Sequence, residues 1–321
     1  MQRMLLVVGS SFLLLLHANV RAAAAAGADT HGLFQSAKLF YKNISSLEFS
    51  YTVQWDMAEI AVENTVRPAS KLKQEFHCMY SGSDFLVKQI SFSSSETNEY
   101  TYAYDGNRFQ FLRRDLGILG LGRQEQQVDM PMFNICSSPI LKQFLFEINE
   151  KRAVTLSDLS KDQIWMDLEE RSELVGEGNI NGHPTVVMRL KHPDDKVEIM
   201  MNLAKDLDFY PLKFIIKYED STTESCVTKH QVQMVDGIKT ILPLVIETKI
   251  FLKNGKLAQA IVTNLDVKSL RFNPVFPVEQ FTISGTSARI VHDVDLDQTL
   301  KRDETTGKTV IPPDAIPMKT P

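Results

Sequence analysis

The sequence contains few cysteines. Its 321 residues include only three, Cys78, Cys136 and Cys226. Because three thiols cannot all pair within one chain, the sequence is compatible with one disulfide and one free thiol, or with three buried thiols. None of them has a second cysteine or a histidine at metal-ligand spacing, apart from the adjacent His77. Neighbours in a strand point to opposite faces, so we expect no metal to be shared by His77 and Cys78.

Motifs that identify common enzyme classes are also missing. The sequence has no Gly-x-Ser-x-Gly and no His-Glu-x-x-His. Gly176, Gly178 and Gly182 do not form a dinucleotide-binding loop, because Pro184 and a β-like run follow where a helix is required. We interpret this glycine-rich stretch as a turn. The sequence therefore predicts a protein that is not an enzyme and that uses no cofactor and no metal.

The chain also lacks an excess of positive charge and a long apolar segment. Its formal net charge is -5 and its lysines and arginines are not clustered, which argues against a nucleic-acid-binding surface. The apolar run at residues 4–16 follows Arg3 and precedes the small residues around Ala22, a pattern typical of a cleaved signal peptide at residues 1–22. This run is shorter than the roughly 20 residues that span a bilayer, and no later run is long enough. We expect a protein that does not span the membrane and that is periplasmic or otherwise secreted.

What the sequence does contain is a series of short strand patterns. Residues 175–267 predict one antiparallel strand after another, since turn residues such as Asp236-Gly237 and Asn254-Gly255 separate them. The connections are too short for crossover helices, so this part of the chain should form a meander. The expected strands are residues 184–190, 197–203, 211–218, 227–235, 240–251 and 256–267.

The first part of the chain shows the same pattern after one helix. Residues 31–43 carry apolar side chains at helical spacing, which predicts an amphipathic helix. Residues 47–55 alternate between apolar and polar side chains, so their register in a sheet is well specified. The glycine-rich residues 116–122 are expected to form a mobile loop. Further strands are expected at residues 58–66, 72–80, 85–93, 99–104 and 108–113.

The hydrophobic period changes between these two parts. Ile140, Phe144 and Ile148 recur at helical spacing, and Ser137-Ser138-Pro139 in front of them suits the start of a helix. Residues 157–168 predict a second short helix.

The chain should therefore form one β domain at residues 31–293, with a helical segment at about residues 130–172. Residues 294–321 are polar, contain several prolines and show no periodicity, which predicts a disordered tail.

Four stretches follow one another in a recognisable order. A helix contains residues 34–40, a strand follows at residues 47–55, and a turn reads Tyr104-Asp105-Gly106-Asn107-Arg108-Phe109. Near the end, Asn273-Pro274 and Phe281 precede Val291-His292-Asp293. In this order and in these motifs the chain resembles the outer-membrane lipoprotein-sorting (LolA-like) superfamily, of which it would be a long, divergent member.

The resemblance implies a fold and a class of ligand. The implied fold is mainly β (α+β): a strongly curved antiparallel sheet forms an incomplete barrel, with an N-terminal helix and with helices that cover the concave face. The implied function is that of a non-catalytic periplasmic carrier whose cavity binds an acyl chain or a lipoprotein lipid anchor. The residues assigned to the cavity lining are Phe109, Phe111, Ile140, Phe144 and Ile148, each of which would also suit an ordinary core position.

Three other functions fit the same sequence, one of which is that of a structural surface protein with a filled core and no ligand. An envelope sensor or regulatory protein would use the same fold to act on an envelope protein partner. A hydrolase of envelope material would need a nucleophile that the sequence does not identify. The sequence alone leaves the identity of the ligand, the pairing of the cysteines and the oligomeric state open.

Overall fold

The computed structural model of the protein describes residues 32–62, 65–93, 96–122, 156–191, 197–235, 237–284, 288–293, 298–302 and 309–310. The signal peptide expected at residues 1–22 lies outside these ranges. Cys136 and three of the proposed cavity residues, Ile140, Phe144 and Ile148, lie outside them as well.

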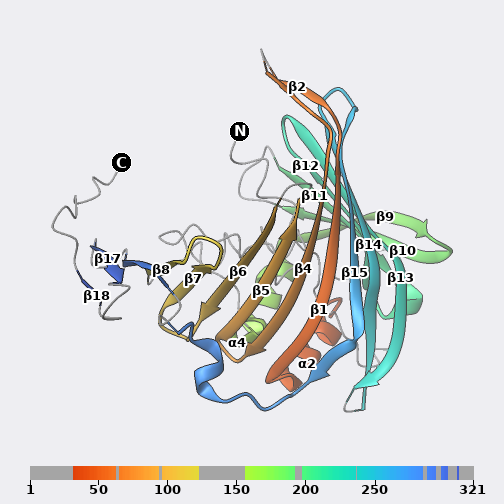
Figure 1. The fold of residues 1–321 in the computed structure, drawn as a ribbon. Coiled ribbons are helices and arrows are strands. Elements are labelled where there is room, and N and C mark those ends of the chain that lie inside the picture. The colour runs from red at the N-terminus through yellow and green to blue at the C-terminus, as the bar shows by residue number, and fades with distance from the viewer. Residues whose placement is uncertain are drawn as a thin grey trace.

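The described strands form one curved sheet of sixteen strands and a separate two-stranded hairpin (Figure 1). The order in the large sheet is β18-β17-β16-β8-β7-β6-β5-β4-β1-β15-β14-β13-β12-β11-β10-β9. All pairings are antiparallel except the one between β16 and β8. The strands of the first half are β1 (Ser46–Met57), β4 (Ser70–Ser81), β5 (Asp84–Phe92), β6 (Thr97–Tyr104), β7 (Phe109–Arg113) and β8 (Ile118–Gly122), and the hairpin consists of β2 (Ile60–Val62) and β3 (Thr65–Arg67).

The second half follows the expected meander. Its strands are β9 (Ser172–Ile180), β10 (His183–Lys191), β11 (Glu198–Ala204), β12 (Tyr210–Lys217), β13 (Ser221–Val235), β14 (Ile238–Leu252) and β15 (Leu257–Phe272). Three short strands near the C-terminus, β16 (Ile290–Asp293), β17 (Gln298–Arg302) and β18 (Thr309–Val310), complete the order. Within the described residues, β9 and β18 each have a strand partner on one side only, so the sheet is not closed into a barrel.

The two halves join where β1 pairs with β15. The register runs from Leu47 opposite Phe272 to Met57 opposite Gln259. The alternation in residues 47–55 explains this position, because the apolar set of β1 is buried on the concave face and the polar set faces outward. A one-residue slip would bury the polar set, so the pattern fixes the register of the central strand.

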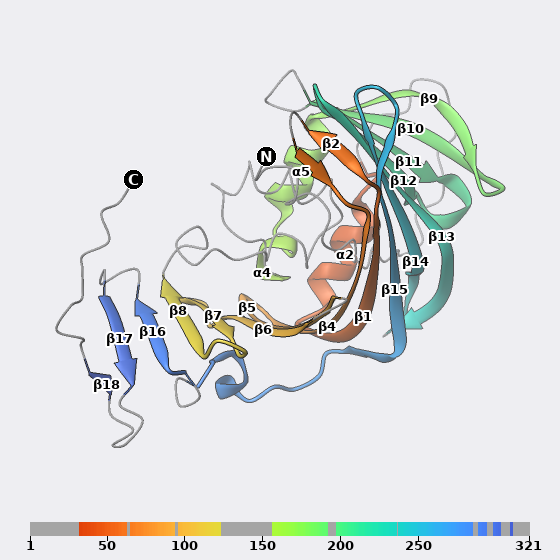
Figure 2. The same cartoon turned by 45° about the horizontal axis from the view of Figure 1, so that its top comes forward.

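Three short helices lie on the concave side of the sheet (Figure 2). They are α2 (Gln35–Asn43), α4 (Leu156–Leu159) and α5 (Asp162–Glu170). Trp165 of α5 is 1% exposed, and its ring lies 5.9 Å from that of Tyr41 in α2. The Trp165 indole N–H donates to the carbonyl oxygen of Leu159, 2.8 Å away, which links α5 to α4. The helix predicted at residues 31–43 is shorter in the structure, where it is α2, and the short helix predicted at residues 157–168 is divided into α4 and α5.

A separate apolar cluster lies on the outer side of the first half. After β15 the chain runs along the outside of the sheet to β16 (Figure 2). This segment includes the short 3₁₀ helix η4 (Val278–Phe281), and Phe281 is 2% exposed. Phe281, Ile283 and Ala288 pack against outward-facing residues of β4 to β8, namely Met79, Leu86, Ala103, Leu112 and Leu119. Where this segment covers β4 to β8, the sheet therefore carries apolar side chains on both faces.

The glycine-rich residues 116–122 differ from the expected mobile loop. Ile118–Gly122 form β8, which pairs with β7 on one side and with β16 on the other. Within this segment only Leu116 and Gly117 belong to a turn, and Gly117 has φ +63°. The prediction was wrong because local composition does not reveal a strand partner that lies far away in the sequence.

The glycines near residue 176 also differ from the prediction of a turn. Gly176 and Gly178 lie within β9, and only Asn181 and Gly182, at φ 53° and 89°, form the turn to β10. An edge strand tolerates glycine, because it packs few side chains.

Part of the predicted disordered tail is also ordered. Gln298–Arg302 form β17, whose Leu300 lies opposite Val291 of β16, and Thr309–Val310 form β18. The edge of β16 supplies the hydrogen-bonding partner for β17, and β17 in turn supplies that for β18.

Cys78 and Cys226 do not form a disulfide with each other. Among the residues that the structure describes, no helix is both long and apolar enough to cross a membrane.

Candidate functional site

An aromatic layer covers the concave face of the first half of the sheet. Its rings come from β1, β4, β5, β6 and β7, because alternate residues of these strands point to the same side. Centroids of neighbouring rings lie between 4.4 and 6.4 Å apart. Most of these pairs are stacked, whereas Phe85 is tilted against Tyr80 and Phe109. The layer consists of Phe49, Tyr51, Phe76, Tyr80, Phe85, Tyr100, Tyr102, Tyr104, Phe109 and Phe111.

The structure places two of the predicted cavity residues in this layer, with different surroundings. Phe109 is 5% exposed and stacks on Tyr104 at 4.4 Å, so it is a core residue. Phe111 is only partly buried and stacks on Tyr102 at 5.1 Å. Opposite Phe111, β8 carries Gly120, which has no side chain. Phe111 therefore lies at the margin of the layer, where a ligand could contact it.

Two further residues at this margin were not predicted. Tyr100 and Tyr104 are partly buried members of the aromatic layer. Arg113 lies with its guanidinium 5.8 Å from the Tyr100 ring, and it also pairs with Asp115 at 3.0 Å. The hydrogen bond from Arg113 lowers the pKa of the Asp115 carboxyl, which keeps this pair charged. Tyrosines occupy every second position from Tyr100 to Tyr104 in β6, and this signal in the sequence would have identified them.

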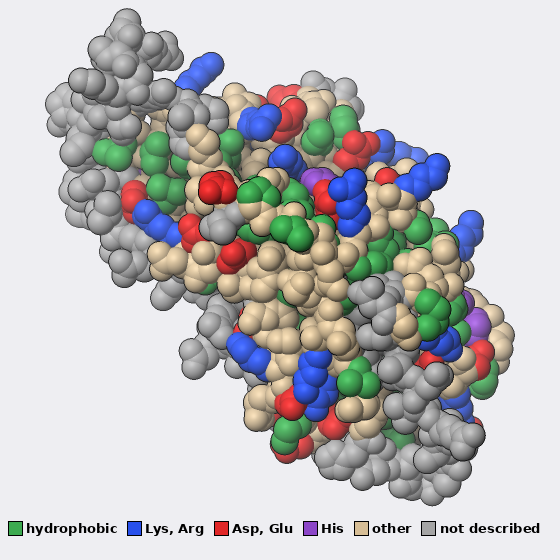
Figure 3. Space-filling view, turned by 90° about the horizontal axis from the view of Figure 1, so that it is seen from below, with side chains coloured by type: hydrophobic (Ala, Val, Ile, Leu, Met, Phe, Trp, Pro, Cys, Tyr) green, Lys and Arg blue, Asp and Glu red, His purple; other side chains and the backbone are tan. Residues whose placement is uncertain are grey.

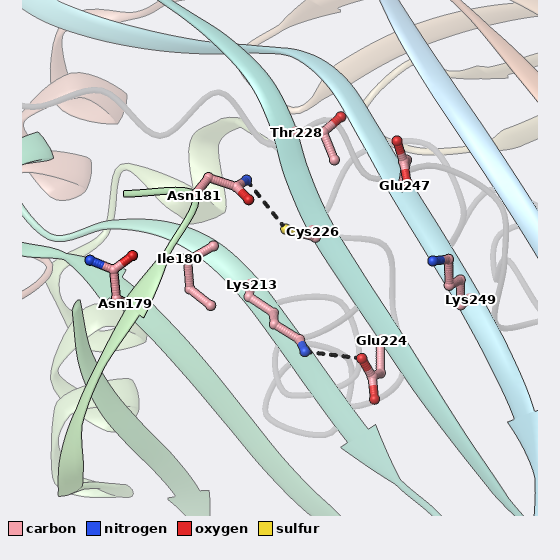
Figure 4. A pocket seen from close by; sticks show the side chains of 9 residues that line it. All are labelled: Asn179, Ile180, Asn181, Lys213, Glu224, Cys226, Thr228, Glu247 and Lys249. Carbon is pink, nitrogen blue, oxygen red and sulfur yellow. Dashed lines mark hydrogen bonds and ion pairs between the residues drawn. The ribbon is translucent and has the colours of Figure 1, made fainter. Parts of the chain in front are cut away.

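A polar groove of about 380 Å³ lies on the outer face of the second half (Figure 4). Strands β12, β13 and β14 supply its floor, and the β9–β10 turn supplies one wall. Its lining residues are Asn179, Ile180, Asn181, Lys213, Glu224, Cys226, Thr228, Glu247 and Lys249. Lys213 pairs with Glu224 at 3.0 Å. Because four charged side chains line it, this outer-face groove does not suit an acyl chain.

The Cys226 thiol in the outer-face groove is not an activated nucleophile. Burial raises the pKa of this thiol, so it stays protonated near neutral pH. The Asn181 side-chain amide approaches its sulfur at 3.9 Å and donates to the carbonyl oxygen of Val227 at 3.3 Å. Sequence reasoning missed the groove because its residues come from four separate segments.

A second polar cluster lies on the outward side of β1, beside the register shift between β1 and β15. Ser50 Oγ lies 3.0 Å from His77 Nδ1, and His77 Nε2 lies 3.3 Å from Glu48 Oε1. Burial is the main cause that lowers the pKa of His77. Lys88 and Arg271 lower it further, whereas Glu48 opposes them.

The cluster has the residue types of a nucleophile, a base and an acid, but not the surroundings of an acyl-transfer site. The Ser50 amide N–H already donates to Ser269 Oγ at 2.7 Å, so it is not available to stabilise an oxyanion beside Ser50. Glu48 is shared with Arg271, whose guanidinium lies 3.4 Å from its carboxylate. These contacts make the cluster a stabilising feature of the irregular β1–β15 pairing.

Within the described ranges, no group of three or more His, Cys, Asp or Glu side chains is placed to hold a metal ion. Cys78 is fully buried and belongs to the concave core, whereas His77 faces the outer cluster. The two neighbours therefore point to opposite faces, as the strand geometry predicts.

No family model and no curated protein matches the sequence. Among solved structures, an uncharacterized conserved protein from Thermus thermophilus aligns at 11% identity and a TM-score of 0.33, covering 80% of this chain and 96% of that one. MucB, in a structure of its complex with MucA(peri), aligns at 9% identity and a TM-score of 0.22, covering 77% and 100%. LprF from Mycobacterium bovis aligns at 7% identity and a TM-score of 0.27, covering 77% and 94%. Because these TM-scores are all below 0.5, no conclusion about function rests on them.

Proposed function

We propose that this protein is a non-catalytic, LolA-like binding protein of the periplasm that carries an acyl chain or a lipoprotein lipid anchor. The observation that carries the proposal is the aromatic layer on the concave face. Ten rings gather on one face of five consecutive strands in the sheet, and three of them, Tyr100, Tyr104 and Phe111, are only partly buried.

The physical basis of binding is the removal of apolar surface from water. Burial of an acyl chain is favourable by about 0.8 kcal/mol per CH₂ group. Flat, mutually stacked rings present a continuous apolar surface along which a flexible chain can lie. Phe111 is the predicted contact that the structure supports best, since it is the less buried of the two described candidates.

The non-catalytic part of the proposal is supported by the state of the nucleophilic side chains. Cys226 has a raised thiol pKa, and the Ser50 amide N–H is already engaged. A fluorophosphonate probe should therefore leave Ser50 unlabelled. Labelling of Ser50 that is lost in Ser50→Ala would instead support the hydrolase interpretation.

The outer surface does not suggest a nucleic-acid ligand either. On the face seen from below, acidic and basic side chains are interspersed, without a large region of one sign (Figure 3). This distribution agrees with the net charge of -5 of the whole chain.

The proposal is tested by binding of a fluorescent long-chain fatty acid to the purified protein and to Phe111→Ala. Loss of one aromatic contact should weaken binding by about tenfold, which corresponds to roughly 1.4 kcal/mol. Val275→Ala is the matched control, because Val275 is 96% exposed and lies outside the concave face. Equal affinities for all three proteins, or no measurable binding by any of them, would contradict the proposal.

Native mass spectrometry of the protein from its own envelope fraction provides the complementary test. We expect a bound acyl species close to one per chain. An unliganded mass together with a co-purified envelope protein would favour the sensor instead.

A further inference from the structure

The tip of the β9–β10 hairpin contacts a part of the sheet that is distant in strand order. Asn181, in the turn, donates its side-chain amide to the Val227 carbonyl oxygen of β13. β13 is irregular here, with register shifts in its pairing to β14 between Val227 and Lys229 and between Lys229 and His230. The hairpin tip is therefore held by contacts between side chains and the sheet, outside the regular β ladder.

Three ionisable side chains meet beside this contact. His183 begins β10, Asp206 lies in the 3₁₀ helix η3 (Lys205–Leu207), and His230 lies in β13. His183 Nδ1 lies 2.8 Å from Asp206 Oδ2, and because a carboxylate only accepts, the nitrogen donates the proton. The rings of His183 and His230 lie edge to face, with 5.3 Å between their centroids.

The charges at this contact balance only while His230 is neutral. Asp206 can neutralise one imidazolium, and it already accepts a hydrogen bond from His183. The neighbouring Lys205 of η3 pairs with Glu177 of β9 at 2.5 Å. Because the two charges of this pair cancel, it does not change the net charge beside the two histidines. Protonation of both rings would leave one uncompensated positive charge between β10 and β13.

The electrostatics of His230 agree with this geometry. Burial is the largest cause that lowers the pKa of His230, and His183 lowers it further, whereas Asp206 raises it. The closed contact thus favours a neutral His230. Since an opened hairpin would bind a proton at His230 more readily, the closed state is most stable above the ordinary histidine pKa of about 6.5 and loses stability as the pH falls below it.

We infer that His183, Asp206 and His230 form a pH-sensitive latch, which holds the tip of the β9–β10 hairpin against β13 at neutral pH and releases it when both imidazoles are protonated. The latch does not depend on the proposed acyl ligand. Release would move Asn179, Ile180 and Asn181, which form one wall of the outer-face groove, away from Cys226 (Figure 4). Acidification would therefore open the groove and expose the Cys226 thiol.

Hydrogen–deuterium exchange of the hairpin tip tests the latch, with exchange times rescaled for the intrinsic effect of pH. Between about pH 7.5 and about pH 5.5, the exchange rate at the tip should rise by roughly threefold to tenfold, the upper value being close to what one histidine can contribute. His230→Gln, which cannot be protonated, should abolish the rise. His77→Gln is the matched control, because it removes a different half-buried imidazole and should leave the rise intact.

The variant Asp206→Asn distinguishes opening of the latch from a general destabilisation of the protein by acid. Without the carboxylate, no anion compensates the two imidazoles, so the rise in exchange should be larger than in the parent protein. An unchanged rate in the parent protein would overturn the inference. So would an equal rise in His230→Gln, or an Asp206→Asn variant that responds no more strongly than the parent.

Discussion

The carbonyl oxygen of Gly117 accepts two hydrogen bonds, from the backbone N–H of Arg289 at 2.7 Å and from that of Ile290 at 3.0 Å. This carbonyl fixes the start of β16 beside the start of β8, with which β16 pairs in parallel. Gly117 adopts φ +63°, and a Cβ atom on it would lie 3.0 Å from Arg289 Cγ. The attachment of the C-terminal strands therefore depends on a residue without a side chain.

Gly117→Ala should destabilise the protein by about 1–2 kcal/mol, because alanine is strained at positive φ and its methyl group crowds Arg289. Gly82→Ala is the matched control, since Gly82 also has positive φ, at +57°, but a methyl group on it would have no neighbouring atom within 4 Å. Hydrogen exchange in Ile290–Asp293 should increase in the Gly117 variant and not in the Gly82 variant. Equal behaviour of the two would mean that backbone strain alone, and not the contact with Arg289, matters.

Asn273 should be more important for stability than its partly exposed position suggests. Its Oδ1 accepts hydrogen bonds from the Ser45 amide at 2.9 Å and the Ser45 hydroxyl at 3.2 Å, while its Nδ2 donates to the Asn43 carbonyl oxygen. It also adopts φ 52°. Asn273→Ala should lower the free energy of unfolding by about 2 kcal/mol, measured by urea denaturation, since it loses these bonds and strains the backbone.

Asn273→Gly separates the two contributions in that experiment. Glycine adopts positive φ without strain, so this variant should lose only the hydrogen bonds and retain more stability than Asn273→Ala. Equal losses would show that strain at this position is negligible.

His77 should titrate below the ordinary histidine range. Burial lowers its pKa, so the native state favours the neutral imidazole. The stability that depends on this residue is fully present above about pH 6.5 and is lost as the pH falls through the lowered native pKa. Proton NMR of the imidazole should show a titration midpoint below about 6.5, the usual value for the side chain.

Glu48→Gln provides the directional control for His77. Glu48 is the group that raises the His77 pKa, so its neutralisation should move the midpoint still lower. Lys88→Met should move it upward. A shift in the opposite direction in either variant would contradict the assignment of these charges.

Sequence patterns predicted the features that depend on neighbouring residues. The alternation from Leu47 to Trp55 identified β1 and the face that it buries, and helical spacing identified α2. The fold class also followed, because repeated turn chemistry with short connections leaves an antiparallel sheet as the consistent solution. The assignment of a ligand cavity stays a prediction: Phe109 and Phe111 share the concave face, whereas Ile140, Phe144 and Ile148 lie outside the described residues.

Features that depend on distant pairing could not be predicted in this way. β8 requires β16, and its glycines alone indicate a loop. Ser50 and His77 are brought together by the β1–β4 register, and the two histidines of the latch belong to strands separated in the sheet by β11 and β12. Each of these contacts is set by register and curvature, for which a single sequence contains no local signal.

The pairing of β1 with β15 has a consequence for how the protein folds. In this pairing Leu47 lies opposite Phe272. Formation of the central strand pair therefore closes a very long loop, made of all the chain between β1 and β15. At a synthesis rate of about 5–20 residues per second, β15 emerges on the order of 10–45 s after β1. During this interval β1 has only β4 as its partner and exposes an apolar, pairing-competent edge, which is a known hazard for aggregation. Folding should be slow and rate-limited by this closure, and a factor that shields β1 before β15 is available would raise the yield of native protein.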